Sequence, residues 1–178
     1  QGFLLGEHRL TGKGTLYEGA VRIPLIIRGP GFEVGADREQ LVANIDIAPT
    51  FLELAGAHAG LELDGSSVMP IAADASSADD REYVLELQGL RTPDEDRALD
   101  PGGFYEPQAW YSLRTPELSY IEHPNGEAEL YDLTADPDQL DNLADDPDQA
   151  ETVAEISARL AELRTCAGAD CRQPATAQ

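Results

Sequence analysis

The strongest constraint on the fold is a helical pattern over residues 148–163. Acidic side chains gather toward the start of this stretch and Arg159 and Arg164 toward its end, which suits the dipole of an α-helix. A helix with one apolar stripe must bury that stripe against another element. The apolar residues that recur at a spacing near 3.6 are Val153, Ile156, Leu160 and Leu163.

Short runs of residues typical of β-strands precede this helix, and a sheet formed by them could pack against its apolar stripe. Their aromatic and β-branched residues are separated by turn signals such as Thr115-Pro116-Glu117 and Pro124-Asn125-Gly126. We therefore expect an antiparallel meander that carries the helix on one face. The runs are 81–87, 110–114, 118–122 and 129–132.

The first half of the chain has a different character. The apolar run 21–28, followed by Gly29-Pro30-Gly31, predicts a buried sheet strand. Asp46 suits the N-cap of a short buried helix that has Pro49 in its first turn and ends at Gly56. Residues 57–78 are small and polar and predict a connector.

These patterns predict two unlike parts in an α/β chain. Residues 1–79 would be the end of an α/β domain, 80–165 a small antiparallel-sheet subdomain with its packed helix, and 166–178 a tail. The chain has 178 residues, which leaves no room for two full enzyme domains.

Composition narrows the class of partner. The net charge of −22 disfavours binding to nucleic acid or to anionic lipid, because both would be repelled over most of the surface. No run of 18 apolar residues is present, so we expect no transmembrane segment. An anionic small molecule remains compatible with this charge if cations gather at one place.

Lys13 is the only lysine and stands between two glycines, in Gly12-Lys13-Gly14-Thr15. Glycine flanks let an ammonium group and backbone N–H groups approach an oxyanion closely, so Lys13 is a candidate anion ligand; a lysine that simply faces water is the alternative. The segment lacks the last residue of a P-loop. His8 is a candidate for the same pocket, although a lone histidine is more often structural. Glu18 and Arg22, four residues apart, predict a bracing ion pair.

Two further patterns have structural interpretations. The acidic run 136–148 lacks the glycine and glutamate of a calcium-binding EF-hand loop, so turns and helix caps explain it better. Cys166 and Cys171, five residues apart, favour a small disulfide loop and an oxidising compartment, with two free thiols as the alternative.

Several blocks taken together resemble the C-terminal third of the type I sulfatases, members of the alkaline-phosphatase superfamily. They keep the family order across nearly the whole chain, and no single block is decisive. The blocks are residues 1–8, Lys13, 17–18, Arg22-x-Pro24, 28–31, 44–50, 64–65, 113–115, 129–133, 136–137, 142–144 and the final helix.

The resemblance implies a hydrolase of sulfate esters that uses a formylglycine nucleophile and a Ca²⁺ ion. It places Lys13 on the sulfate oxygens and makes Gln1 a candidate calcium ligand. The Cys/Ser-x-Pro-x-Arg motif that yields formylglycine is absent here, so the chain alone is expected to be inactive and to need the N-terminal part of the catalytic domain as its partner. The opening residues and the cysteine tail look most like secreted bacterial sulfatases of sulfated sugars, which implies a secreted, periplasmic or cell-surface location.

Two alternatives stay open. A phosphonate or phosphodiester hydrolase of the same superfamily would use the same lysine, because phosphate and sulfate esters share tetrahedral oxyanion geometry. A non-catalytic acidic module would instead bind a carbohydrate or protein surface, with Tyr105, Trp110 and Tyr111 as candidate stacking residues.

Overall fold

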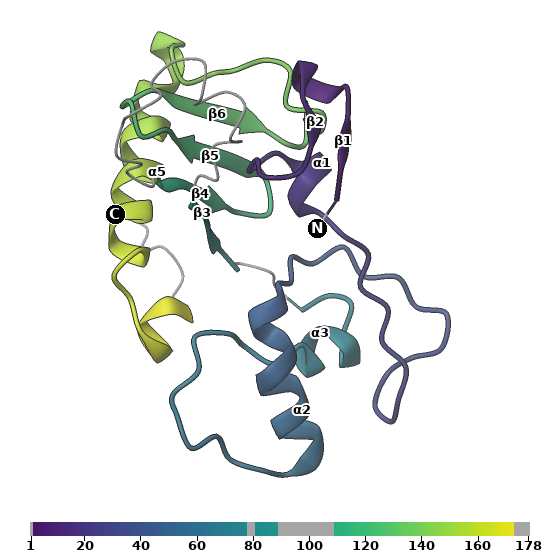
Figure 1. Cartoon of the computed structure of the whole chain (residues 1–178). Coiled ribbons are helices and arrows are strands. Elements are labelled where there is room, and N and C mark those ends of the chain that lie inside the picture. Colours follow the sequence, from purple (N-terminus) through teal and green to yellow (C-terminus); the bar gives the residue numbers. More distant parts are fainter. Residues whose placement is uncertain (1, 78–80, 89–108, 173–178) are drawn as a thin grey trace, which may run out of the picture.

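The computed structural model describes residues 2–77, 81–88 and 109–172, and its centre is a four-stranded antiparallel sheet (Figure 1). The strand order is β3-β4-β5-β6, with neighbours in the sheet also neighbours in the chain. The predicted meander is therefore confirmed. The strands are β3 (Tyr83–Gln88), β4 (Ala109–Arg114), β5 (Leu118–Glu122) and β6 (Ala128–Asp132).

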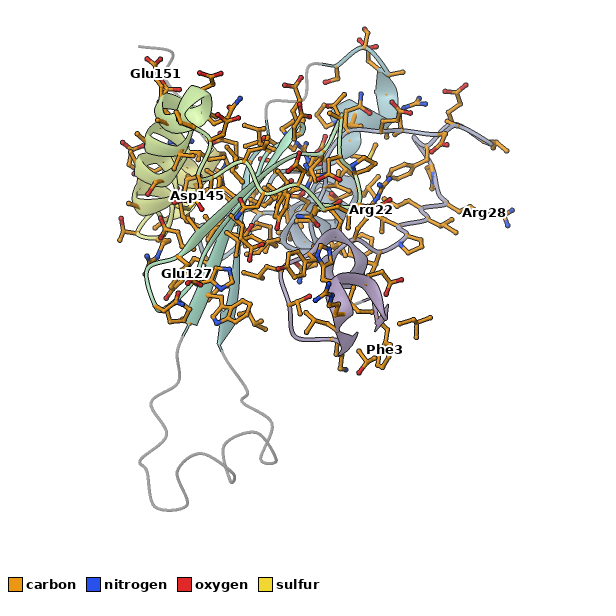
Figure 2. The ribbon with its side chains drawn as sticks, turned by 90° about the horizontal axis from the view of Figure 1, so that it is seen from above. Phe3, Arg22, Arg28, Glu127, Asp145 and Glu151 are labelled. Atoms are coloured by element: carbon orange, nitrogen blue, oxygen red, sulfur yellow. A yellow bond between two sulfur atoms is a disulfide. The ribbon has the colours of Figure 1, made fainter. Side chains whose placement is uncertain are left out.

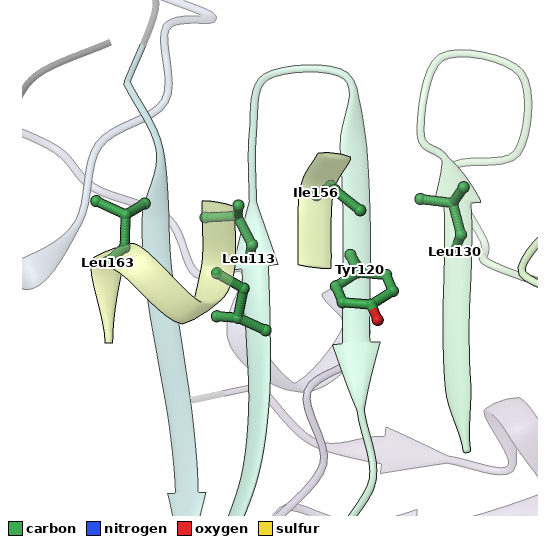
Figure 3. Packing of buried hydrophobic residues seen from close by; sticks show 6 residues of the cluster. Leu113, Tyr120, Leu130, Ile156 and Leu163 are labelled. Carbon is green, nitrogen blue, oxygen red and sulfur yellow. The ribbon is translucent and has the colours of Figure 1, made fainter. Parts of the chain in front are cut away.

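Helix α5 (Ala150–Leu163) packs on one face of this sheet, as the helical pattern predicts. A short 3₁₀ turn, η3 (Pro147–Gln149), leads into it, and the Asp146 carboxylate caps that turn by accepting from the Asp148 N–H at 2.9 Å. The apolar stripe of α5 meets alternate sheet residues that point toward it (Figure 3). The buried members of this core are Leu113, Tyr120, Leu130, Ile156, Leu160 and Leu163.

The N-terminal segment covers the opposite face of the sheet (Figure 1). Leu16 packs there against Ile121 and Tyr131, which alternate along their strands with the residues that face α5. The sheet is thus buried on both faces in this region. The elements of this segment are β1 (Leu4–Leu5), η1 (Glu7–Arg9), β2 (Thr11–Gly12) and α1 (Glu18–Val21).

The prediction of a buried strand over residues 21–28 is wrong for this chain. Residues 22–28 follow α1 without regular structure, and Ile26 is 92% exposed. In Figure 2 the Arg28 side chain extends away from the sheet and helices. A strand needs a neighbour to satisfy its backbone groups, and none of the strands in the described ranges pairs with this segment.

Helix α2 (Ile47–Ala55) has Pro49 in its first turn and ends at Gly56, which adopts a left-handed φ of 60°, as the sequence predicts. It is not buried, however: Thr50 is the only buried residue of α2, and Phe51 is 63% exposed. The connector after it contains a short helix, α3 (Met69–Ala73), with Pro70 near its start. None of the described helices combines the length and apolar character that crossing a membrane requires.

Cys166 and Cys171 are joined by a disulfide near the end of the described residues, and Cys171 lies within the 3₁₀ turn η4 (Gly168–Arg172). The turn is docked on the connector, since Gly168 N–H donates to the Asp64 carboxylate at 2.7 Å and Ala169 N–H donates to Glu62 at 3.1 Å. The bond therefore closes a loop that is already held by contacts with a distant part of the chain.

Replacing both cysteines with serine is expected to lower the free energy of unfolding by about 2 kcal/mol or less, because the closed loop is short. Urea unfolding of the intact protein measures this. Thiol titration of the native protein without reductant should find no reactive group at either position, and two free thiols would contradict the bond.

Candidate functional site

The two candidate site residues near the N-terminus lie on one tight β-hairpin. β1 and β2 pair as Leu4 with Gly12 and Leu5 with Thr11, and η1 forms the turn between them. Lys13 follows β2 directly and is exposed. Its neighbours Gly12 and Gly14 have φ values of 108° and 101°, which favour glycine over any other residue. Lys13 is thus exposed directly after the second strand of the hairpin, and the residues on both sides of it have backbone conformations that only glycine readily adopts.

His8 sits in the turn of this hairpin in a left-handed conformation, with φ 53°. Its imidazole ring is stacked on the phenol ring of Tyr17, with the ring centroids 3.8 Å apart and the planes within 4° of parallel. The Tyr17 hydroxyl in turn donates to Glu129 Oε1 at 3.1 Å. The His8 turn is therefore connected through Tyr17 to strand β6, 112 positions further along the chain than Tyr17.

Glu129 is the centre of a polar cluster on this face of the sheet. Tyr131 donates to its second oxygen, Oε2, at 2.6 Å, and His123 Nε2 lies 2.6 Å from Oε1. The carboxylate side chain is only 14% exposed. The Trp110 ring lies against the His123 imidazole with centroids 4.6 Å apart, so the cluster is enclosed by aromatic groups.

Burial and the Glu129 carboxylate raise the pKa of Tyr17 to about 12, and the same two causes raise the pKa of Tyr131. Both effects disfavour a phenolate, because burial penalises its charge and the carboxylate repels it. Both phenols therefore stay protonated well above neutral pH and keep donating to Glu129.

This cluster predicts a loss of stability in alkali. In the unfolded chain the phenols lose their protons near pH 10, whereas in the folded chain they keep them to higher pH. The unfolded state then binds fewer protons, so the free energy of unfolding falls as pH rises through 10 toward 12. Urea unfolding at pH 8, 10 and 11 measures this, and the slope should be smaller in a Tyr17→Phe, Tyr131→Phe double variant.

Glu18 fixes the other end of the hairpin segment, but not with the partner that the sequence predicts. Its carboxylate pairs with Arg114 of β4, with Nε 2.8 Å from Oε1, and the pair with Arg22 is therefore wrong for the described residues. The Glu18 N–H also donates to Gln139, whose side chain is 1% exposed and donates to Ser119 Oγ. The predicted bracing role of Glu18 is real, and it connects α1 to the sheet rather than to its own helix.

Asp46 is buried at 1% exposure, at a junction remote in sequence from the hairpin. Its side chain does not cap α2 itself. It accepts instead from Ala43 N–H at 2.9 Å, from Ser66 N–H at 2.8 Å and from the Tyr83 hydroxyl, and it pairs with Arg81 at 3.4 Å. Asp46 therefore joins the start of α2, the connector and β3.

The remaining predicted residues fall elsewhere. Gln1 and Tyr105 lie outside the described residues. Carboxylates in the acidic run form turns, as predicted: Asp136 Oδ2 accepts from Leu140 N–H at 2.7 Å and from Asp141 N–H at 2.9 Å. Within the described ranges, no three His, Cys, Asp or Glu side chains form a group that could hold a metal ion.

Comparison with known proteins finds relatives for this part of the chain. The family model described as N-sulphoglucosamine sulphohydrolase, C-terminal, matches residues 6–88, which include η1, β2, α2 and β3 but not β1. The chain is 35% identical over 184 residues to human N-acetylglucosamine-6-sulfatase, covering 91% of this chain and 33% of the relative. It is also 35% identical to N-acetylglucosamine-6-O-sulfatase of Bacteroides thetaiotaomicron, covering 80% of this chain and 25% of the relative.

Solved structures agree with these relatives. A protein in complex with its substrate D-glucosamine-2-N,6-O-disulfate superposes with a TM-score of 0.75 at 28% identity, covering 92% of this chain and 32% of that protein. This chain therefore resembles the C-terminal region of sulfatases in both sequence and fold. A phosphonate monoester hydrolase from Silicibacter pomeroyi shares the fold with a TM-score of 0.69 at 28% identity, covering 86% of this chain and 31% of that protein.

The chain spans between a quarter and a third of the length of these two curated relatives. Its resemblance to sulfatases and its fold class are as the sequence predicts. Sequence reasoning found the lysine and the histidine of the hairpin but not their support, because Tyr17 and Glu129 are an ordinary aromatic and an ordinary acid until the fold brings them together.

Proposed function

We propose that this sulfatase region is the C-terminal part of an enzyme that hydrolyses sulfate esters of sugars, in which Lys13 binds the sulfate group. The observation that carries the proposal is the position of Lys13, exposed at the edge of a hairpin between two left-handed glycines. The similarity to two N-acetylglucosamine-6-sulfatases and to a protein bound to a disulfated glucosamine supports a sulfated sugar as the substrate class.

In the proposed chemistry, the residues of this chain bind and orient the sulfate ester. An ammonium group at Lys13 would neutralise charge on the sulfate oxygens as the ester bond breaks. The formylglycine nucleophile would come from the part of the protein before this chain. A calcium ion would supply further positive charge, but the described residues alone do not form a site for it.

The partner of this chain would be the rest of the catalytic domain. Residues 1–79 would complete a larger α/β sheet, residues 80–165 would form the small subdomain, and residues 166–178 a tail. Exposed apolar side chains at Ile23, Leu25 and Ile26 support this arrangement, because a strand buried in a larger sheet would cover them. The disulfide supports an oxidising location such as the periplasm or the outside of the cell.

A second candidate is hydrolysis of phosphonate monoesters, favoured by the likeness to the hydrolase from Silicibacter pomeroyi. The non-catalytic sugar-binding module has less support. The Tyr111 ring is already covered by the Arg164 guanidinium, 3.5 Å from its centroid, and Trp110 already contacts His123.

The test is an assay of the intact protein against N-acetylglucosamine-6-sulfate, with phenylphosphonate monoester as the competing substrate. Release of inorganic sulfate at a kcat/KM at least tenfold above that for the phosphonate would support the proposal. A reversed preference would establish the second candidate. Binding of the sugar without release of either anion would favour a non-catalytic role.

A further inference from the structure

The His8 turn has a strained backbone, and the stack of His8 on Tyr17 is a contact that can hold it in place. His8 and Arg9 both adopt left-handed φ values, 53° and 59°, without being glycine. Such conformations are unfavourable for residues that have a Cβ atom, and they persist only where the surroundings impose them. The ring contact that the structure provides for His8 is the parallel stack on Tyr17.

Tyr17 is itself held by buried neighbours. Its hydroxyl donates to Glu129, and the adjacent Leu16 is 4% exposed and packs against Ile121 and Tyr131 on the sheet. Glu129 cannot swing away freely, because Tyr131 and His123 contact it from within β6 and from the end of β5. The sheet thus presents a fixed carboxylate, the carboxylate orients the phenol, and the phenol ring orients the imidazole.

We propose that Tyr17 and Glu129 are positioning residues that hold the His8 turn, and with it the Lys13 loop, in the geometry that receives the substrate. The role deepens the proposed function, on which it rests. Neither residue needs to touch the substrate, since Tyr17 acts through the ring of His8 and Glu129 acts through the hydroxyl of Tyr17. Misplacement of a catalytic group by even 1 Å is costly in rate, so loosening this support should be visible in turnover.

Tyr17→Phe is the sharpest variant, because it keeps the ring that stacks on His8 and removes the hydroxyl that donates to Glu129. We expect kcat/KM for a sulfated glucosamine to fall about tenfold in the intact protein, mostly through kcat. The matched control is Tyr120→Phe, which removes a hydroxyl that donates to another carboxylate, that of Glu122, on the opposite face of the same sheet. The control should stay within about twofold of the wild type, although both variants lose similar stability.

A double-mutant cycle tests whether Tyr17 acts through His8. If it does, Tyr17→Phe combined with His8→Ala should be no slower than His8→Ala alone, because the positioned group is already gone. Independent, multiplying effects of the two changes would overturn the proposal.

A second measurement does not depend on activity. Trypsin cuts after Arg9 and Lys13 only when the hairpin opens, so initial cleavage at these sites should be several times faster in Tyr17→Phe than in Tyr120→Phe. If the wild type releases no sulfate, the proposed function fails while the cleavage result still decides the positioning role. If Tyr17→Phe matches Tyr120→Phe in cleavage and in turnover, the positioning role is wrong.

Discussion

Replacement of Lys13 with Ala in the intact protein should lower kcat/KM for a sulfated glucosamine by about 10² to 10³, the scale for losing one preorganised group that stabilises developing charge. Lys13 is the only lysine of the chain and sits where two left-handed glycines shape the loop. Its side chain is exposed, so its removal should leave folding intact. Initial rates of sulfate release, together with unfolding curves, measure both effects.

Two companion variants sharpen this test. Lys13→Arg should also be slow, because a planar guanidinium cannot replace a compact ammonium in a tight oxyanion site. Arg9→Gln removes one positive charge from the same hairpin and should leave the rate within a few-fold, since Arg9 is exposed and has no assigned role. Near-normal rates in both Lys13 variants, with folding unchanged, would show that Lys13 does not bind sulfate.

The parts of the fold that sequence predicts well are those fixed by neighbours in the chain. The meander and α5 follow from alternation and from a 3.6-residue period, and both halves of that packing are present in this chain. The run 21–28 has an equally clear pattern and forms no strand, because no described strand lies beside it. An apolar pattern can therefore indicate that a segment is suited to a buried strand, but a strand forms only where another strand lies beside it.

In the candidate site, too, the sequence indicates some residues and gives no signal for others. Glycine flanks and family resemblance are enough to single out Lys13. Its support depends on pairs such as Glu18 with Arg114, 96 positions apart, and Tyr17 with Glu129, 112 positions apart, and a single sequence gives no signal for either. Spacing along the chain favours a local Glu18–Arg22 pair, but in the fold the Glu18 carboxylate lies beside strand β4 and pairs with its Arg114.

Asp46 stands at the N-cap position that the sequence predicts, but its side chain makes more contacts than a cap would. As a simple N-cap, its loss would cost about 1 kcal/mol. In the structure its carboxylate satisfies two backbone N–H groups, the Tyr83 hydroxyl and the Arg81 guanidinium in a site that is 1% exposed. The backbone at Gly65 approaches this site so closely that a Cβ there would lie 2.3 Å from the Ile45 carbonyl oxygen and 2.9 Å from Asp46 Oδ1.

Asp46→Ala should therefore lower the free energy of unfolding by about 3 to 5 kcal/mol, the scale for breaking a buried charge pair and leaving its donors unsatisfied. The matched control is Asp146→Ala, which removes a carboxylate that caps η3 at the exposed surface and should cost about 1 kcal/mol. Urea unfolding of the intact protein compares the two. Equal losses would mean that the buried contacts of Asp46 stabilise the fold no more than a single surface cap does. A smaller loss in Asp46→Asn than in Asp46→Ala would separate the contribution of the charge from that of the hydrogen bonds that the side chain accepts.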